Sequence, residues 1–389
     1  MSENPRPAPT SRGDAGADLP PEPPAPKPVR GRGAVSNPTG RFREIHLAHD
    51  VAFADDEPDT DEAGEPARPK TIYLEDASRS AIAWNDSPDV GFEASINPYR
   101  GCEHGCIYCY ARPYHEYLGW SAGLDFETRL LVKRDLPALL EAELMSPRWT
   151  PRVLALSGVT DAYQPVERHL KITRGCLEVL ARFKNPVGIV TKSALVERDI
   201  DLLAELARVG AAGVWLSLTT LDRSLQLALE PRASSPARRL EAVRALAQAG
   251  IPVGVMTAPV IPGLNDHELP ALLEAAAEAG ARYAGYVVLR LPHGVKDLFS
   301  TWLEHHVPLK KDKILSRIAD LRGGELNDSR FGVRMRGVGP FAEQIRSLFL
   351  AGCRRAGLAT ESPPLSTAAF RRPLRGQLAL FPEAPPEGP

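Results

Sequence analysis

Three cysteines close together carry the strongest chemical signal in this sequence. Cys102, Cys106 and Cys109 follow one another with the spacing C-x3-C-x2-C. A structural zinc site closes with four protein ligands, and an ordinary [4Fe–4S] cluster takes four thiolates. Three thiolates on one short loop can hold three irons of a cubane and leave the fourth iron open to a chelating cosubstrate. The spacing therefore predicts an iron–sulfur site that is one protein ligand short.

A zinc site is the main alternative, with His104 or His115 as the fourth ligand. Zinc sites usually pair one C-x2-C half-site with a second half-site. The remaining cysteines, Cys176 and Cys353, are single and far away in the sequence. Cys176 falls in an apolar helical pattern and is expected to be a small buried hydrophobic residue. The spacing favours the cluster over zinc.

Short β-rich runs and amphipathic helical runs alternate through the middle of the chain. The predicted strands are 91–96, 152–156, 187–191, 213–218, 251–256 and 283–289. The predicted helices between them include 136–145, 174–183, 197–209, 237–249 and 267–279. Such alternation gives parallel strands with helices outside the sheet. Six units of this kind predict an α/β fold, a partial (β/α)6 barrel of the TIM type.

Polar residues lie where the predicted strands end, which is the edge that holds the reacting groups in such barrels. The cysteine loop follows the first strand. The polar and turn residues after the later strands are Thr160, Asp161 and Tyr163, then Lys192, then Ser217, and finally Pro262 and Gly263. A lysine inside a barrel is costly without an anionic partner, so Lys192 predicts a bound anion. Alternatively, Lys192 and Ser217 only cap helices and Pro262-Gly263 is an ordinary loop.

The cysteine loop, with Tyr108 directly before its last cysteine, resembles the cluster loop of the radical S-adenosylmethionine (SAM) superfamily. The succession of cysteine loop, Thr-Asp turn, Thr-Lys-Ser, Ser-Leu-Thr and Pro-Gly turn most resembles the spore-photoproduct-lyase-like branch, often described as DNA-repair-photolyase-like. The resemblance covers roughly residues 72–350. It implies two cofactors, a [4Fe–4S] cluster and SAM, and an external one-electron reductant similar to flavodoxin or ferredoxin. It also implies reductive cleavage of SAM to methionine and a 5′-deoxyadenosyl radical, which abstracts hydrogen from the substrate.

The resemblance further implies roles for the residues at the strand ends. The glycine-rich turn of the superfamily, here reduced to one glycine and Asp161, binds the SAM amino group. The other implied SAM contacts are Tyr108 beside the adenine, Thr160 in the same turn as Asp161, Lys192 at the carboxylate, Ser217 at the carboxylate or ribose, and Pro262-Gly263 in the adenine-binding turn.

One departure from that branch concerns the hydrogen donor. In spore photoproduct lyase, a cysteine in the turn after the second strand returns the hydrogen atom. This chain has Gly158 there and no cysteine in residues 157–165. If the protein repairs thymine lesions, another donor such as Tyr110 or Tyr163 has to serve. Three functions follow as alternatives: a radical SAM enzyme acting on DNA, one acting on RNA, a peptide or a metabolite, and a non-catalytic metal-binding or redox-sensing protein.

The segments before the barrel differ from it in composition. Residues 1–70 are proline-rich and then acidic, and are predicted to be largely disordered. An island from Gly31 to Phe42 alternates arginine with glycine at its start. It could contact nucleic acid or pack as an ordered arm on the catalytic domain. The predicted divisions of the chain are 1–70, a barrel core at 71–330, a basic helical extension at 331–360 and a flexible tail at 361–389.

The C-terminal region is strongly basic. Residues 330–376 contain nine arginines and two glutamates, a local charge of +7, which favours a polyanionic partner unless these arginines are only a solvated helix face. Beyond them, Gln377-Leu378-Ala379-Leu380-Phe381 resembles the peptide by which bacterial replication and repair proteins dock into the sliding clamp. The alternative is that these apolar residues fold back onto the barrel.

The remaining composition predicts a cytoplasmic enzyme. The chain of 389 residues has a net charge of −2, which by itself suggests no partner. No N-terminal apolar run resembles a signal peptide and no stretch approaches the length of a membrane span, so no membrane partner is expected. Five cysteines without paired spacing argue against a secreted disulfide framework.

Overall fold

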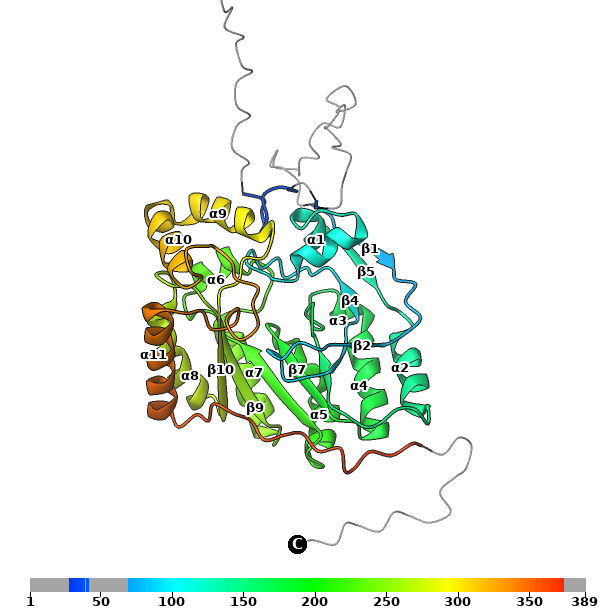
Figure 1. The fold of residues 1–389 in the computed structure, drawn as a ribbon. Helices are drawn as coiled ribbons and strands as arrows, with labels where there is room; N and C mark the ends of the chain where they lie inside the picture. The colour runs from blue at the N-terminus through cyan, green and yellow to red at the C-terminus, as the bar shows by residue number, and fades with distance from the viewer. Residues whose placement is uncertain (1–27, 39, 42–68, 374–389) are drawn as a thin grey trace, which may run out of the picture.

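The computed structural model describes residues 28–38, 40–41 and 69–373 (Figure 1). Most of the segment predicted to be disordered lies outside the described residues, and so does the predicted clamp-binding peptide Gln377–Phe381. Within the described residues, no helix is both long and apolar enough to span a bilayer.

One seven-stranded sheet forms the centre of the molecule (Figure 1). Its strands are β2 (Ile82–Trp84), β3 (Ala94–Ile96), β6 (Leu154–Leu156), β7 (Val187–Thr191), β8 (Ala212–Ser217), β9 (Val253–Val260) and β10 (Tyr283–Val288). The order is β10-β9-β8-β7-β6-β3-β2, parallel from β3 to β10, with β2 antiparallel at the edge. The six predicted parallel strands and the open, partial barrel are confirmed.

The central strands bury one face in the main core of the molecule. Leu154, Val187 and Ala212 are register partners across β6, β7 and β8. All three are fully buried in the main core. The opposite face is less covered, because β7 and β8 alternate buried residues with half-buried or exposed ones and Val190 is 44% exposed.

Helices cover the outside of the sheet (Figure 1). They are α2 (Leu136–Met145), α3 (Glu167–Leu170), α4 (Ile172–Phe183), α5 (Ile200–Ala207), α6 (Arg223–Leu229), α7 (Pro236–Gln248), α8 (Leu269–Glu278), α9 (Val295–His306), α10 (Lys311–Asp320) and α11 (Pro340–Ala356). In α4, Ile172, Cys176, Leu180 and Phe183 are buried along one face at helical spacing. The prediction that Cys176 is a buried hydrophobic residue is confirmed.

A second, smaller sheet supports the cysteine loop. It has the order β1-β5-β4, with β1 (Ile72–Glu75), β5 (Arg129–Val132) and β4 (Tyr99–Arg100). The 3-10 helix η2 (Arg112–Leu118) and helix α1 (Leu124–Thr128) lie between the loop and β5. The shorter 3-10 segments are η3 (Ala194–Asp199), η4 (Asp266–Glu268) and η5 (Pro308–Lys310).

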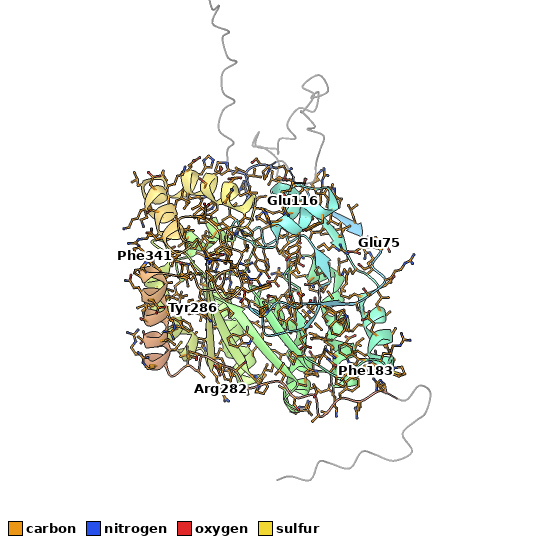
Figure 2. The ribbon with its side chains drawn as sticks, in the orientation of Figure 1. Glu75, Glu116, Phe183, Arg282, Tyr286 and Phe341 are labelled. Atoms are coloured by element: carbon orange, nitrogen blue, oxygen red, sulfur yellow. The ribbon has the colours of Figure 1, made fainter. Side chains whose placement is uncertain are left out.

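The C-terminal segment after α11 crosses the amino ends of the strands, opposite the edge that carries the cysteine loop. The backbone N–H of Ser366 donates to the carbonyl of Gly210 at 2.8 Å, and that of Arg371 to Phe183 at 2.9 Å. Phe183 is labelled near the lower edge of the molecule in Figure 2. Two residues of the segment 361–373 are therefore hydrogen-bonded to the barrel, while the predicted division of the chain at residue 361 stays a prediction.

The arginines of the basic C-terminal region do not form one patch. Those that the structure describes lie in the loop before α11, on α11 and in the segment at the opposite edge of the sheet, while Arg375 lies outside the described residues. Carboxylates offset several of their charges through ion pairs, namely Arg330–Asp328, Arg334–Asp89, Arg346–Glu343 and Arg355–Glu274. The net charge counted along the sequence is therefore divided in space among separate parts of the described surface, and a polyanionic partner for this region stays a prediction.

Candidate active site

The cysteine loop starts at the carboxyl end of β3 and turns back on itself beside the small sheet. Cys102 and Cys106 are buried and Cys109 is half-buried, and all three are free thiols. The loop turns at Gly101, with φ of +84°, and at Gly105, with φ of +67°. The second backbone conformation brings the Gly105 N–H to the Cys102 carbonyl at 3.4 Å. Glycine reaches such angles without a steric cost.

The donor set of this loop fits a [4Fe–4S] cluster. Burial raises the pKa of the Cys102 thiol, and the charges of Asp161, Cys106 and Cys109 raise it further, so the three sulfurs interact electrostatically. A raised pKa keeps the thiol protonated, whereas metal binding requires thiolates, so a bound cluster would displace the thiol proton. In the described ranges, no group of three or more His, Cys, Asp and Glu side chains is arranged to hold a single metal ion. A cubane takes one thiolate at each of three irons, which needs no such convergence on one ion.

Of the two histidines that could have completed a zinc site, His104 contacts Asp161, whereas the Nε2 atom of His115 is buried without a hydrogen-bond partner among the described residues. The His104 Nδ1 atom lies 3.4 Å from the Asp161 Oδ2 atom. The His115 ring packs between Trp120, at a centroid distance of 5.1 Å, and Phe126, at 5.5 Å.

The N-terminal arm, residues 28–38, packs directly on the cysteine loop. The N–H groups of Gly33 and Ala34 donate to the two carboxylate oxygens of Glu127 at 3.0 and 2.9 Å. Arg32 donates to the Glu127 backbone carbonyl at 2.8 Å. Of the two interpretations of the Arg-Gly island, these contacts favour an ordered arm on the catalytic domain.

We expect Gly33→Ala to displace the arm and loosen the loop. A Cβ atom at position 33 would lie 1.8 Å from the Gly105 carbonyl oxygen, which is backbone and cannot rotate away. Overpacking of this kind lowers the free energy of unfolding by about 1–3 kcal/mol. Chemical denaturation, together with the iron content after anaerobic reconstitution, measures the effect. Gly40→Ala is the matched control because a Cβ there meets nothing within 4 Å; equal losses in both variants would contradict the prediction.

A buried arginine organises the centre of the loop. Arg112 is fully buried, and its Nε atom donates to the Cys106 carbonyl at 3.0 Å. Its Nη1 atom donates to the carbonyls of Ala122 and Gly123, and its Nη2 atom pairs with Glu127 at 2.5 Å. Sequence patterns did not predict the ion pair between Arg112 and Glu127. The one sign of it in the sequence is Glu127 within the partly apolar run of α1, and this residue alone does not indicate which side chain pairs with it.

Asp161 joins the turn after β6 to β7 and to the cysteine loop. Its carboxylate accepts hydrogen bonds from the Thr191 hydroxyl at 2.7 Å and from the Lys192 backbone N–H at 2.8 Å, beside its contact with His104. Burial opposes the charge, but His104 and these donors hold the pKa of Asp161 at about 2. Thr160, its neighbour, donates to the Tyr99 carbonyl at 2.7 Å. Their predicted contacts with SAM stay a prediction.

Tyr108 is held in a buried network between the loop and β8. Its hydroxyl donates to Glu230, which forms an ion pair with Arg239. Arg239 donates to the backbone carbonyl of Ser217 at 2.9 Å. Although burial raises the pKa of Glu230, Arg239, Lys192 and the hydrogen bonds from Thr219 and Tyr108 hold that pKa below its ordinary value. The carboxylate therefore stays charged and fixes the ring.

Lys192 extends from the end of β7 toward the same ring. Its Nζ atom lies 5.9 Å from the Tyr108 ring centroid, and its side chain is half-buried. The structure thus brings three predicted site residues, Lys192, Tyr108 and Ser217, around the cysteine loop. Gly263, after β9, adopts φ of +83° while its N–H donates to Asp266 at 2.9 Å, so the Pro262-Gly263 turn requires glycine.

The two tyrosines predicted as hydrogen donors lie in different surroundings. Tyr110 is 41% exposed, and its hydroxyl donates to the Gly158 carbonyl at 3.0 Å. Tyr163 is fully buried in the main core, with the Arg198 guanidinium 5.9 Å from its ring. A donor has to reach the substrate, and the packing around Tyr163 blocks this. Tyr110 is thus the more accessible of the two, and the role of either tyrosine as a hydrogen donor stays a prediction.

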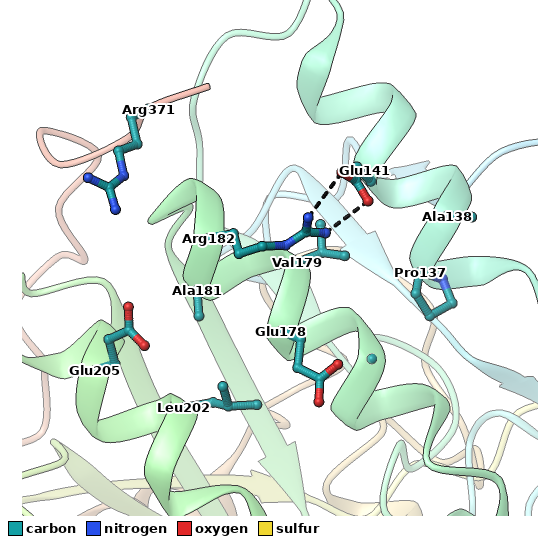
Figure 3. Close-up of a pocket in the computed structure, with 11 residues that line it drawn as sticks. Pro137, Ala138, Glu141, Glu178, Val179, Ala181, Arg182, Leu202, Glu205 and Arg371 are labelled. Atoms are coloured by element: carbon teal, nitrogen blue, oxygen red, sulfur yellow. Dashed lines mark hydrogen bonds and ion pairs between the residues drawn. The ribbon is translucent and has the colours of Figure 1, made fainter. Parts of the chain in front are cut away.

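One pocket of the molecule is unrelated to this site (Figure 3). It has a volume of about 600 Å³ and lies between α2, α4, α5 and the C-terminal segment. Arg182 and Glu141 form an ion pair across it at 2.8 Å. It opens on the helical layer rather than at the strand ends, so we place no chemistry there.

Comparisons with known proteins agree with this site. Residues 96–276 match the model of the radical SAM superfamily. An uncharacterized protein of Mycobacterium tuberculosis is 36% identical over 283 residues, covering 72% of this chain and 80% of the relative. An uncharacterized protein of Methanocaldococcus jannaschii is 32% identical over 187 residues, covering 47% of this chain and 66% of the relative.

The solved structures add a likeness of fold. A spore photoproduct lyase variant superposes with a TM-score of 0.54 at 18% identity, covering 74% of this chain and 81% of the lyase. Spore photoproduct lyase complexed with a dinucleoside spore photoproduct gives a TM-score of 0.53 at 17% identity, with the same coverage. At this identity the likeness concerns the fold alone. With its three-cysteine loop at the carboxyl edge of the barrel, the chain belongs to the radical SAM superfamily.

Proposed function

We propose that this enzyme cleaves SAM reductively at a [4Fe–4S] cluster held by Cys102, Cys106 and Cys109, and that it acts on DNA, as a repair enzyme for a damaged base. Membership of the superfamily indicates the two cofactors, a [4Fe–4S] cluster and SAM. The observation that carries the proposal is the presence of three interacting thiols, two of them buried and one half-buried, beside Lys192 and the Tyr108 network at one edge of the barrel. When bound, the cluster would supply the electron that splits SAM into methionine and a 5′-deoxyadenosyl radical able to abstract hydrogen from the substrate.

The residues of this chain would bind and orient the cosubstrate. The Lys192 ammonium is the cation that would neutralise the SAM carboxylate, and Ser217 lies within the same network through its carbonyl. Tyr108, fixed by Glu230, would present its ring to the adenine. Asp161 holds the β6 turn against the loop, and we propose that the turn itself binds the amino group.

Two observations support DNA as the substrate. Spore photoproduct lyase, which shares the fold, was solved with a dinucleoside spore photoproduct. The exposed Tyr110 beside the loop would replace the missing turn cysteine as the hydrogen donor, since its hydroxyl reaches the Gly158 carbonyl of that turn. An external reductant of the flavodoxin or ferredoxin type would complete the reaction.

We expect anaerobically reconstituted protein to release 5′-deoxyadenosine from SAM with dithionite, and to release it faster with UV-irradiated DNA than with intact DNA. The physical reason is that substrate binding closes water out of the site and orients the reacting atoms. Chromatographic quantification of 5′-deoxyadenosine measures the rate. Release that no DNA alters would overturn the DNA assignment and keep the SAM chemistry. A complete lack of release would overturn both.

A further inference from the structure

An arginine that forms no ion pair with any described residue lies beside the cysteine loop at the carboxyl end of β10. The Arg290 guanidinium is 5.4 Å from the ring of Tyr110, the residue after Cys109. Its Nη1 atom makes a weak contact with the Met335 sulfur at 3.7 Å. Its Nε atom is buried and has no hydrogen-bond partner among the described residues.

A second arginine reinforces this positive charge. Arg322 is 3% exposed, and its Nη2 atom donates to the carbonyl of Leu289, the residue before Arg290, at 2.7 Å. Its Nη1 atom donates to the Val333 carbonyl at 3.1 Å, while its Nε atom is buried without a partner in the part of the chain that the structure describes. Carbonyl oxygens accept from its Nη atoms but do not neutralise its charge.

The nearby carboxylates are already engaged by other arginines. Asp89 pairs with Arg334 at 2.5 Å, and Asp328 pairs with Arg330 at 2.7 Å. Burial and then Arg290 lower the pKa of Arg322 to about 10, whereas Asp328 acts in the opposite direction. Burial and then Arg334 lower the pKa of Arg290, against Tyr110, Tyr114 and Asp89. The local charge is therefore positive and lacks a counter-ion of its own.

Buried cations without a counter-ion are costly, and a bound anion removes that cost. Guanidinium groups match the oxygen geometry of phosphate through bidentate hydrogen bonds. Exposed aromatic rings lie near these arginines. Tyr114, which acts electrostatically on Arg290, is 55% exposed. Phe331, whose ring centroid lies 4.5 Å from the Arg334 guanidinium, is 58% exposed. Arginines interleaved with exposed aromatic rings are typical of single-stranded nucleic-acid sites, where phosphates meet the cations and bases stack on the rings.

We propose that Arg290 binds a backbone phosphate of a nucleic-acid strand whose base enters the site beside Tyr110, and that the buried charge of Arg322 behind it strengthens this binding. This inference rests on the proposed function, and it names the group of the substrate that the barrel mouth recognises. It separates two anion sites, with Lys192 on the side of SAM and Arg290 on the side of the substrate. The phosphate could come from a polynucleotide or from a free nucleotide, and the experiment distinguishes these sources.

The test measures binding of fluorescein-labelled single-stranded decathymidylate to reconstituted protein by fluorescence anisotropy. We expect Arg290→Met to weaken binding by about 10- to 100-fold, the loss typical of a hydrogen bond to a charged group. We also expect a lower salt slope, by about 0.7 for one phosphate contact on a single strand. Arg290→Lys, which keeps the charge but not the bidentate geometry, should fall in between. SAM binding, measured by calorimetry, should not change.

Arg346→Met is the matched control, since Arg346 lies on α11, is exposed and pairs with Glu343. It should bind the oligonucleotide like the wild type. A second experiment uses the wild type alone. Decathymidylate with neutral methylphosphonate linkages should bind it much more weakly than the phosphodiester form does. Competition by thymidine monophosphate as strong as that by the oligonucleotide would assign the site to free nucleotides and overturn the strand assignment.

The failures of the two proposals are distinguishable. Equal binding by wild type and Arg290→Met overturns the phosphate site while irradiated DNA still stimulates 5′-deoxyadenosine release. Binding of the methylphosphonate oligonucleotide as tight as that of the phosphodiester overturns it as well. A wild type that releases 5′-deoxyadenosine but binds no oligonucleotide overturns both the phosphate site and DNA as the substrate.

Discussion

Replacing Cys102, Cys106 or Cys109 by alanine is expected to abolish SAM cleavage. In the proposed site each thiolate would bind a different iron of a cubane, so the loss of one would leave the cluster with two protein ligands. Removal of an outer-shell partner of a metal site costs about 10–100-fold in affinity or activity, and the loss of a direct ligand should exceed that range. Iron and sulfide content, the visible absorbance of the reconstituted protein and 5′-deoxyadenosine release measure the loss.

Cys176→Ala and Cys353→Ala are the matched controls for the cluster. Both cysteines are buried in the main core, away from the loop, so their removal changes packing and not the donor set. We expect iron content and 5′-deoxyadenosine release close to those of the wild type. Full cluster retention by an alanine variant at position 102, 106 or 109 would contradict the ligand assignment, as would equal iron loss in the controls.

Arg112→Met is expected to lower the free energy of unfolding by about 3–5 kcal/mol, the cost of removing one partner of a buried ion pair. The substitution leaves the Glu127 carboxylate buried beside an apolar side chain. It also removes the donors to the carbonyls of Cys106, Ala122 and Gly123. The loop should lose its shape, so iron content should fall together with stability. Denaturant titration, with the iron-to-protein ratio of the reconstituted variant, measures both effects.

Arg182→Met provides the comparison for a similar pair in water. Arg182 and Glu141 form their ion pair at the exposed pocket of Figure 3. Exposed pairs of this kind contribute only about 0–1 kcal/mol, because water screens them in the folded state. We expect near-wild-type stability and unchanged iron content. A loss at position 182 as large as that at position 112 would mean that burial is not the source of the effect.

The parallel barrel could be predicted because its signals are local. Helix α2 (Leu136–Met145) and strand β7 (Val187–Thr191) have the predicted bounds, since their apolar spacing is continuous and their ends are marked. Strand β9 continues to Val260, past the predicted end at residue 256, because pairing with β10 continues there. The small sheet could not be predicted. Its strands are short and β1 (Ile72–Glu75) is exposed, so no apolar pattern marks them.

The predicted site residues likewise divide into those that local sequence signals indicate and those that depend on contacts in space. Covalent spacing alone identified the three cysteines, and the rule that chemistry lies at strand ends identified Lys192 and Ser217. Neither cysteine spacing nor position at a strand end indicates Glu230 or Arg112, because each acts through a contact that only folding forms. The same limit applies to Tyr163, whose burial depends on the packing of the main core.

The sequence by itself determined the donor set, the order of strands and helices and the edge of the barrel at which they act. These depend on residue spacing along the chain, which the covalent structure fixes. Only the tertiary structure decided which charges meet. It paired Arg334 with Asp89, placed the N-terminal arm on Glu127 and left Arg290 beside Tyr110 without a carboxylate. Electrostatic interactions depend on distance in space and on burial, and neither quantity can be read from position in the sequence.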